Sequence, residues 1–182
     1  MKRVALFLAN GFEEIEALGT VDILRRAKIA VETVSITSDK NVQGAHGINV
    51  VADKTFDEFN ANDIDVLVLP GGMPGAKNLN EHEALKKLVT EFAGNPDKNV
   101  AAICAAPMVL GGLGLLDGKE ATCYPGFEAE LIGAKVTEEK VVESENIITG
   151  KGPGLVFDFG LQLVETIAGV ATRKEVQEGL LL

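Results

Sequence analysis

The chain has 182 residues, of which 46% are hydrophobic, and it carries a formal net charge of −10. This length and composition are typical of one domain with a full core, so we expect a single domain over residues 1–182. The negative charge disfavours nucleic acid and anionic membranes as partners, because both bind clustered Lys and Arg.

The N-terminal residues do not have the pattern of a secretion signal, since Lys2-Arg3 is followed by a short apolar run (4–9) and then a polar turn. No apolar run approaches the ~20 residues that span a bilayer. The two cysteines, Cys104 and Cys123, do not make a disulfide framework. We therefore expect a cytoplasmic protein without a membrane partner.

The first predicted elements are a strand over 4–9, apolar enough to be buried on both faces, and a helix over 12–27. Residues at helical spacing give this helix one apolar stripe, made of Phe12, Ile15, Gly19, Ile23 and Ala27. Glu16 falls on the stripe, whereas Glu13 and Glu14 do not. A carboxylate on a core-facing stripe indicates a functional or strained site, and the alternative is that Glu16 lies at the edge of the stripe and reaches solvent.

The next predicted elements are a strand over 31–36, a hairpin over 43–52 and a buried strand over 65–69. His46 lies at the tip of the predicted hairpin. It could act as a ligand or an acid, and the alternative is that it is simply a solvated side chain. The loop after strand 65–69 contains Gly71-Gly72 and is neither a Walker loop nor a dinucleotide fingerprint. It is either a plain turn or a place where backbone amides approach a ligand.

A buried strand over 99–103 runs directly into Cys104, and Pro107 marks the start of a helix. This pattern predicts a nucleophile held exposed on a sharp strand-to-helix turn. The amides of a helix N-terminus would then lower the pKa of the thiol. The alternative is a buried and inert cysteine.

The other predicted helices cover 81–93, 155–168 and 172–181, with short strands near 135–136, 141–142 and 147–149. This alternation predicts an α/β sandwich with a largely parallel sheet. Ligands bind such sheets outside the carboxyl ends of the strands, where Gly71-Gly72 and Cys104 should converge with Glu16. A thiolate, a protonated carboxyl group and the amides of Gly72 and Ala105 would suffice for covalent catalysis.

Four motifs in this order resemble the ThiJ/PfpI superfamily, and its deglycase branch most closely: GFEEIEA (11–17), LPGGMPGA (69–76), AAICAAP (101–107) and GKGPG (150–154). The resemblance implies a flavodoxin-like three-layer sandwich and a homodimer that needs no cofactor and no metal. It implies an oxidation-sensitive nucleophile at Cys104 and a protonated partner at Glu16. Its implied pocket also includes Glu13, Gly71, Gly72, Tyr124 and Pro153.

The activities implied by the resemblance are a glutathione-independent glyoxalase, a deglycase acting on small reactive aldehydes or glycated adducts, and a redox-sensing or chaperone role. Relatives active as glyoxalases often carry a histidine where this chain has Tyr124, which is a poor base at pH 7. Ala105 stands where the protease branch has a histidine, which disfavours protease activity. Cys123 is either a resolving thiol or a spectator.

Overall fold

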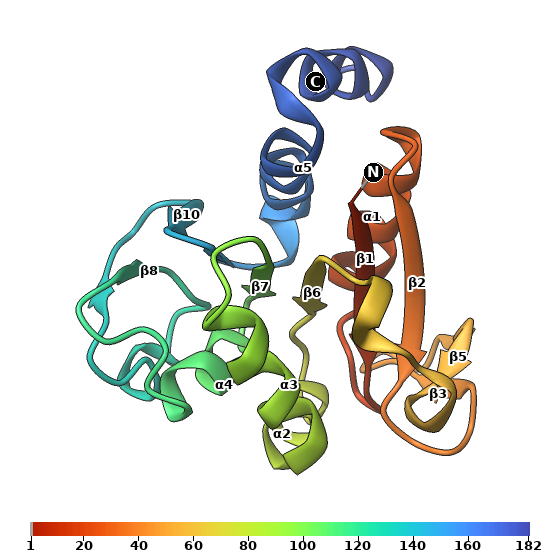
Figure 1. Cartoon of the computed structure of the whole chain (residues 1–182), viewed down its shortest axis with the longest axis vertical. Helices are drawn as coiled ribbons and strands as arrows, with labels where there is room; N and C mark the ends of the chain where they lie inside the picture. The colour runs from red at the N-terminus through yellow and green to blue at the C-terminus, as the bar shows by residue number, and fades with distance from the viewer. Residues whose placement is uncertain (1) are drawn as a thin grey trace.

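The structure is a computed structural model that describes residues 2–182, and Figure 1 shows it as a ribbon. Its central sheet has seven strands in the order β10-β11-β7-β6-β1-β2-β5. All pairings in this sheet are parallel except that between β10 and β11. The strand bounds are β1 Arg3–Leu8, β2 Ala30–Ser35, β5 Lys54–Thr55, β6 Val66–Leu69, β7 Asn99–Ile103, β10 Val141–Ser144 and β11 Ile147–Gly150.

Continuous apolar sequence explains the three central strands, because both faces of a parallel sheet are covered by helices. Residues 66–69 and 100–103 are completely buried, and so are residues 4–9. Five of the six parallel strands, in the order β2-β1-β6-β7-β11, have the order of a flavodoxin-like sheet, which confirms the predicted fold class. In this strand order the topological switch point, where ligands bind at the carboxyl ends of the strands, lies between β1 and β6. Strand β7 is the next neighbour of β6.

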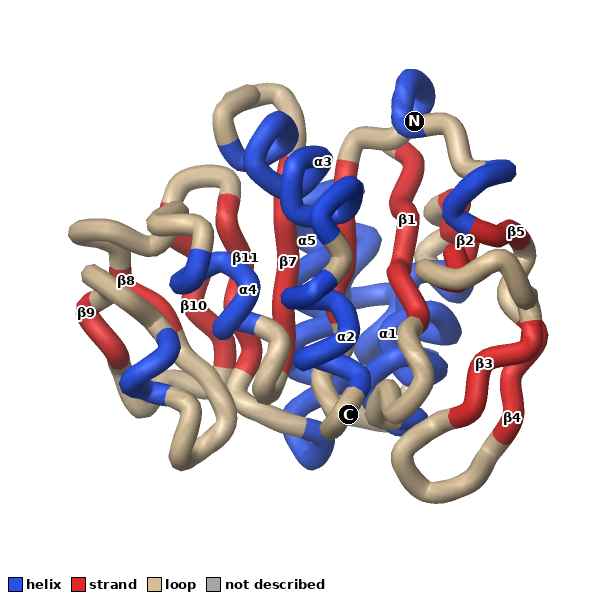
Figure 2. The backbone as a smooth tube through the Cα atoms, turned by 90° about the horizontal axis from the view of Figure 1, so that it is seen from below, coloured by secondary structure: helices blue, strands red, loops and turns tan. Residues whose placement is uncertain are grey.

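Helices cover both faces of the sheet (Figure 2). On one face α1 (Glu14–Arg26) packs against α5 (Val156–Gly179). On the other face lie α2 (Gly75–Glu81), α3 (Glu83–Ala93) and α4 (Pro107–Gly112). Because β1, β6 and β7 are parallel, the amino ends of α1, α2 and α4 follow the carboxyl ends of these strands.

Helix α5 joins the two predicted C-terminal helices across a kink at Gly169, whose φ of 85° and ψ of 167° are not helical. By length and composition alone, the stretch Pro153–Gly179 would suffice to cross a membrane. However, Phe159, Leu163 and Val164 of this helix are fully buried in the core. The helix contacts α1 and β11, as a core helix of this fold does.

Two small sheets flank the main one. A hairpin of β3 (Asn41–Gln43) and β4 (Asn49–Val51) confirms the predicted excursion around His46. On the other side β8 (Glu120–Ala121) pairs with β9 (Lys135–Val136). Short 3₁₀ turns occupy Phe56–Glu58, Ala61–Asp63, Glu128–Glu130 and Pro153–Leu155.

The predicted stripe of α1 is partly wrong. Ile15 is 57% exposed, whereas Glu13 and Glu14 are buried. Val21 and Leu24, which lie off the predicted stripe, also belong to the core. The buried face is rotated because α5 packs along the helix and the β3–β4 hairpin covers its first turn, two contacts that helical spacing cannot reveal.

Candidate active site

Cys104 lies on a strained turn between β7 and α4, as the sequence predicts. Its φ of 65° is in the left-handed region, which costs a non-glycine residue of the order of 1 kcal/mol. Backbone hydrogen bonds fix this conformation, because Cys104 N–H donates to Gly150 O at 2.9 Å and Tyr124 N–H donates to Cys104 O at 2.8 Å. Unlike the prediction, the residue is buried, with only 8% of its surface exposed.

Glu16 and Cys104 meet at Gly71. The carboxyl group of Glu16 is completely buried, and its Oε2 accepts a hydrogen bond from Gly71 N–H at 2.8 Å. A methyl group placed on Gly71 would lie 2.7 Å from Glu16 Oε2 and 3.0 Å from Cys104 Sγ. The two functional groups therefore approach the same point from α1 and β7, and Glu16 does not lie at a solvent-exposed edge.

Gly72 completes this arrangement with its backbone. Its φ of +87° favours glycine, and a Cβ atom would lie 2.4 Å from Glu13 N. The loop is tied to the start of α1, since Glu13 N–H donates to Gly71 O at 2.9 Å. In this position the backbone N–H groups of Gly72 and Ala105 act on the Cys104 sulfur in the direction that lowers the pKa of the thiol.

The Glu16–Cys104 pair has strongly perturbed proton affinities. Burial raises the pKa of Glu16 to about 7, against the opposing hydrogen bonds from Gly71 and Cys104. Burial and the negative charge of ionised Glu16 also raise the pKa of Cys104 to about 12, and the Gly72 and Ala105 amides lower it. The prediction that a helix N-terminus lowers the pKa of this thiol is therefore wrong, because burial, together with the charge of Glu16, outweighs the two amides.

The pair can instead share one proton. When the proton resides on Glu16, the charge that opposes the thiolate is gone. Glu16 Oε1 is buried and has no hydrogen-bond partner among residues 2–182, so a proton on this oxygen is free to be donated to the sulfur or to a bound substrate. A carboxyl group with a pKa of about 7 exists in both forms near neutral pH, which suits proton transfer.

The remaining predicted site residues surround this centre. Tyr124 is 45% exposed and lies over Gly152, where a Cβ atom would be 3.1 Å from its ring. Pro153 follows Gly152 at the end of β11 and is partly buried. Glu13 caps α1 by accepting a hydrogen bond from Glu16 N–H at 2.7 Å. Cys104 and Cys123 are both free thiols, and burial raises the pKa of Cys123 to about 11.

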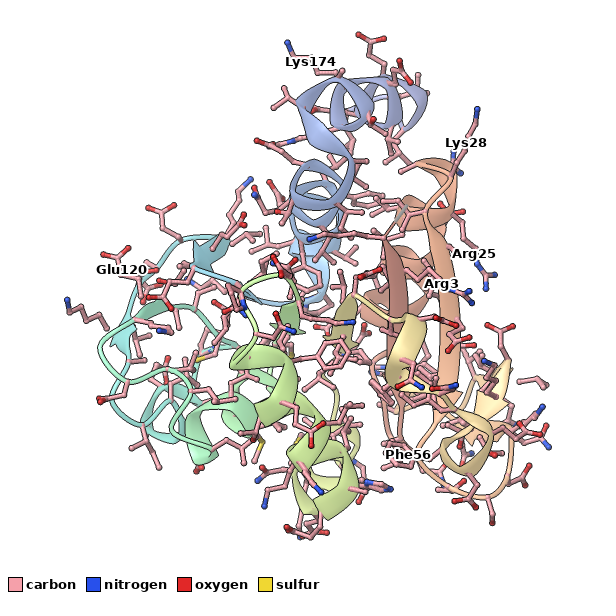
Figure 3. The ribbon with its side chains drawn as sticks, viewed as in Figure 1. Arg3, Arg25, Lys28, Phe56, Glu120 and Lys174 are labelled. Atoms are coloured by element: carbon pink, nitrogen blue, oxygen red, sulfur yellow. The ribbon has the colours of Figure 1, made fainter. Side chains whose placement is uncertain are left out.

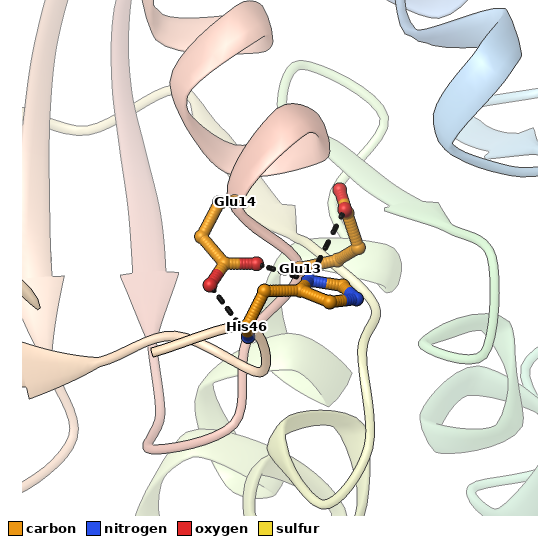
Figure 4. A group of neighbouring side chains, drawn as sticks. All are labelled: Glu13, Glu14 and His46. Carbon is orange, nitrogen blue, oxygen red and sulfur yellow. Dashed lines mark hydrogen bonds and ion pairs between the residues drawn. The ribbon is translucent and has the colours of Figure 1, made fainter. Parts of the chain in front are cut away.

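Sequence patterns missed one contact beside the site, which Figure 4 shows. His46 Nδ1 lies 2.7 Å from Glu14 Oε2, and this contact raises the pKa of the imidazole. The histidine is thus not merely solvated, although its side chain is 70% exposed. The two glycines that flank it, Gly44 and Gly47, were the only signal of a tightly folded tip.

A cavity of about 710 Å³ lies at the opposite end of the sheet, between the ends of α1 and α5. Its lining includes Lys2, Lys28 and Val176. Figure 3 shows Arg3 and Lys28 at this end, where β1 begins. The cavity is therefore remote from the carboxyl ends of the strands and from Cys104.

A flavodoxin-like sheet with a cysteine on a strained turn directly after β7 defines the class of protein. Residues 2–166 match the DJ-1/PfpI family, and the chain belongs to this family. The glutathione-independent glyoxalase DJ-1 of Schizosaccharomyces pombe is 33% identical over 92% of both chains. The Arabidopsis thaliana DJ-1 homologs A and B are each 35% identical, and the chain spans 47% and 42% of their length.

Solved structures agree with this assignment. A cysteine-to-alanine mutant of the DJ-1 superfamily protein STM1931 from Salmonella typhimurium has a TM-score of 0.94 and 39% identity, covering 99% of this chain and 98% of that one. An oxidized form of Toxoplasma gondii DJ-1 also has a TM-score of 0.94, at 34% identity, covering 100% and 98%.

Proposed function

We propose that the protein is a cofactor-free, cysteine-dependent glyoxalase or deglycase. Its substrates would be 2-oxoaldehydes such as methylglyoxal, or the early adducts that such aldehydes form with amines and thiols. The observation that carries this proposal is the meeting of Cys104 Sγ and Glu16 Oε2 at Gly71. The name of the S. pombe relative, a glutathione-independent glyoxalase, supports the same reaction class.

The first step is addition of the sulfur to the aldehyde. Ionised Glu16 accepts the thiol proton as Cys104 Sγ forms a bond to the aldehyde carbon, and the carbonyl electron pair moves to oxygen. The N–H groups of Gly72 and Ala105, which also lower the pKa of the Cys104 thiol, would stabilise the developing oxyanion. Glu16 then protonates this oxygen, which gives a hemithioacetal.

The second step moves one proton between adjacent carbons. Ionised Glu16 removes the proton from the former aldehyde carbon, and the electron pair enters an enediol. The proton returns to the neighbouring carbon while the hydroxyl on the sulfur-bearing carbon gives up its proton to Glu16, which forms the C=O of a thioester of the 2-hydroxy acid. Water then attacks the thioester carbonyl, the C–S bond breaks, and Cys104 takes back a proton. The sum is methylglyoxal plus water to lactate, with no external oxidant or reductant.

The test is formation of lactate from methylglyoxal without glutathione. We expect Cys104→Ser and Glu16→Gln each to reduce kcat/KM by at least ~10³-fold, because each removes a group that acts on the reacting atoms. Cys123→Ser is the matched control and should retain the parental rate. A Cys104→Ser variant as active as the parent would rule out the proposal.

A second candidate function is a redox sensor or chaperone in which Cys104 is oxidised without turnover. The oxidised structure of the T. gondii relative favours it, as does the carboxyl group of Glu16, which would donate a hydrogen bond to a sulfinate. Intact-mass analysis after mild peroxide should show a gain of two oxygen atoms in the parent and none in Cys104→Ser. A protein that gains two oxygen atoms but does not turn over methylglyoxal would favour the redox-sensor function. Absence of the mass gain would exclude that function.

We also propose that the protein is a homodimer, with the partner packed on the first turns of α1. Ile15 and Leu18 of this helix are 57% and 38% exposed, and Ile48 of the adjacent hairpin is 53% exposed. Light scattering coupled to size exclusion should give twice the chain mass for the parent. Ile15→Glu with Leu18→Glu should give the monomer mass, and a parent that is already monomeric would contradict this part of the proposal.

A further inference from the structure

Glu13, Glu14 and His46 form a cluster at the edge of the candidate site (Figure 4). The two glutamates come from the start of α1 and the histidine from the tip of the β3–β4 hairpin. The tip is fixed there by its backbone, because Ala45 N–H donates to Phe12 O at 2.8 Å and His46 N–H donates to Glu14 Oε1 at 2.7 Å. The backbone hydrogen bonds of the hairpin tip therefore also hold the imidazole near the carboxylates.

The spacing of the three groups fits one metal ion. His46 Nδ1 lies 2.7 Å from Glu14 Oε2 and 4.0 Å from Glu13 Oε1, and the three donor atoms lie within 4.8 Å of one another. Ligands at ~2.0–2.2 Å from a cation are at most about 4.4 Å apart. Both distances from Nδ1 fall within this limit, so small side-chain rotations close the coordination set.

The bonding of Glu13 leaves one of its carboxylate oxygens available to a ligand. The residue is 93% buried, being only 7% exposed, and its Oε2 accepts the hydrogen bond from Glu16 N–H. Within residues 2–182 no group donates a hydrogen bond to Oε1, which is directed toward His46. This oxygen faces the imidazole of His46 and keeps its lone pairs free, so it can serve as a ligand to a cation at this point.

The short contact between His46 and Glu14 shows that the imidazole nitrogen is already oriented toward the carboxylate. His46 Nδ1 and Glu14 Oε2 are 2.7 Å apart and joined by a hydrogen bond, and a divalent cation would take the place of the shared proton. The cluster thus has two carboxylates to balance a divalent charge and an imidazole nitrogen already directed at them.

We propose that Glu13, Glu14 and His46 bind one divalent transition-metal cation of the zinc class. An imidazole nitrogen combined with carboxylate oxygens suits Zn²⁺ and its neighbours, whereas Mg²⁺ prefers oxygen ligands alone and retains its waters. The His46 side chain is 70% exposed in the single chain, so the remaining coordination positions are open to water or to a further ligand. This inference concerns a binding site and does not depend on the proposed glyoxalase activity.

The test is calorimetric titration of the full chain with ZnCl₂. The titrated protein carries Cys104→Ser and Cys123→Ser, so that no thiolate competes for zinc. We expect one Zn²⁺ per chain and no comparable binding of Mg²⁺. Adding His46→Ala should weaken zinc binding by at least 10-fold, since loss of even an outer partner of a metal ligand costs ~10–100-fold.

The matched control is His82→Ala, which removes the other histidine of the chain and should leave zinc binding unchanged. Circular dichroism verifies that each variant is folded, and Glu13→Gln, which preserves side-chain shape, serves as a second test. Absence of zinc binding overturns the proposal. So does binding that survives both His46→Ala and Glu13→Gln, or binding that His82→Ala weakens equally. Because the titrated protein lacks the nucleophile, none of these outcomes bears on whether the parent turns over methylglyoxal.

Discussion

Gly71→Ala is the substitution that tests the geometry of the site most directly. The added methyl group would lie 2.6 Å from Cys104 Cβ, 2.7 Å from Glu16 Oε2 and 3.0 Å from Cys104 Sγ. Contacts under 3.0 Å cannot persist, so the sulfur and the carboxyl group must separate. The φ of Gly71 is not in the positive range, and an alanine there meets no backbone strain. The effect of the substitution is therefore purely steric.

The expected losses of stability and of rate in Gly71→Ala follow from this steric crowding. Overpacking a filled site costs about 1–3 kcal/mol of stability, so the variant should fold with a reduced Tm. A displacement of about 1 Å between catalytic groups costs ~100-fold in rate, which corresponds to about 2.7 kcal/mol in the barrier. We therefore expect kcat/KM for methylglyoxal to fall ~100-fold while most of the fold survives.

The assay is lactate formation, with Gly112→Ala as the matched control. A Cβ atom on Gly112 would meet only Asn80 Oδ1, at 3.8 Å, so this helix position should accept alanine without loss of rate. Thermal unfolding of both variants separates loss of fold from loss of geometry. Parental activity in Gly71→Ala would refute the close approach of Cys104 and Glu16 on which the mechanism depends.

Two further predictions concern pH and the pocket. Since the folded chain binds the Glu16 proton more tightly than the unfolded chain, stability should fall as pH rises from 4.5 toward 7, by about 3 kcal/mol in total. Urea unfolding should show this loss in the parent but not in Glu16→Gln, and equal pH profiles would contradict the buried, protonated carboxyl group. Tyr124→His should raise the glyoxalase rate several-fold by supplying a base near pH 7, whereas Tyr124→Phe should not; no gain with histidine would show that this position takes no part in proton transfer.

The sheet and the nucleophile could be predicted because their signals are local. The apolar runs before Asn10, Pro70 and Cys104 are long enough to require burial, and their alternation with helices leaves few possible topologies. Pro107 then fixes where the helix after Cys104 begins. Helix α2 was missed because its sequence, GAKNLNE, has no continuous apolar stripe, and its buried residues are Gly75, Ala76 and Leu79.

The chemistry of the site was harder to predict because it depends on contacts between distant residues. A low pKa for Cys104 was predicted from residues 104–107 alone, because they form a helix N-terminus. The largest effects on this pKa are burial and the charge of Glu16, and both raise it. Glu14 and His46 are separated by 32 residues, and only the folded hairpin brings them together.

The burial of Glu13, Glu14 and Glu16 in one helical turn has a single physical explanation. Each carboxyl group has a specific partner: Glu13 accepts from Glu16 N–H, Glu14 from His46 and Glu16 from Gly71 N–H. Buried carboxylates without such partners would be strongly destabilising. The partners come from three different segments, so the first turn of α1 fixes the hairpin and the Gly71-Gly72 loop around Cys104. Stability and chemistry at this turn thus depend on the same hydrogen bonds, and for that reason substitutions of Glu13 or Glu16 should be judged by stability as well as rate.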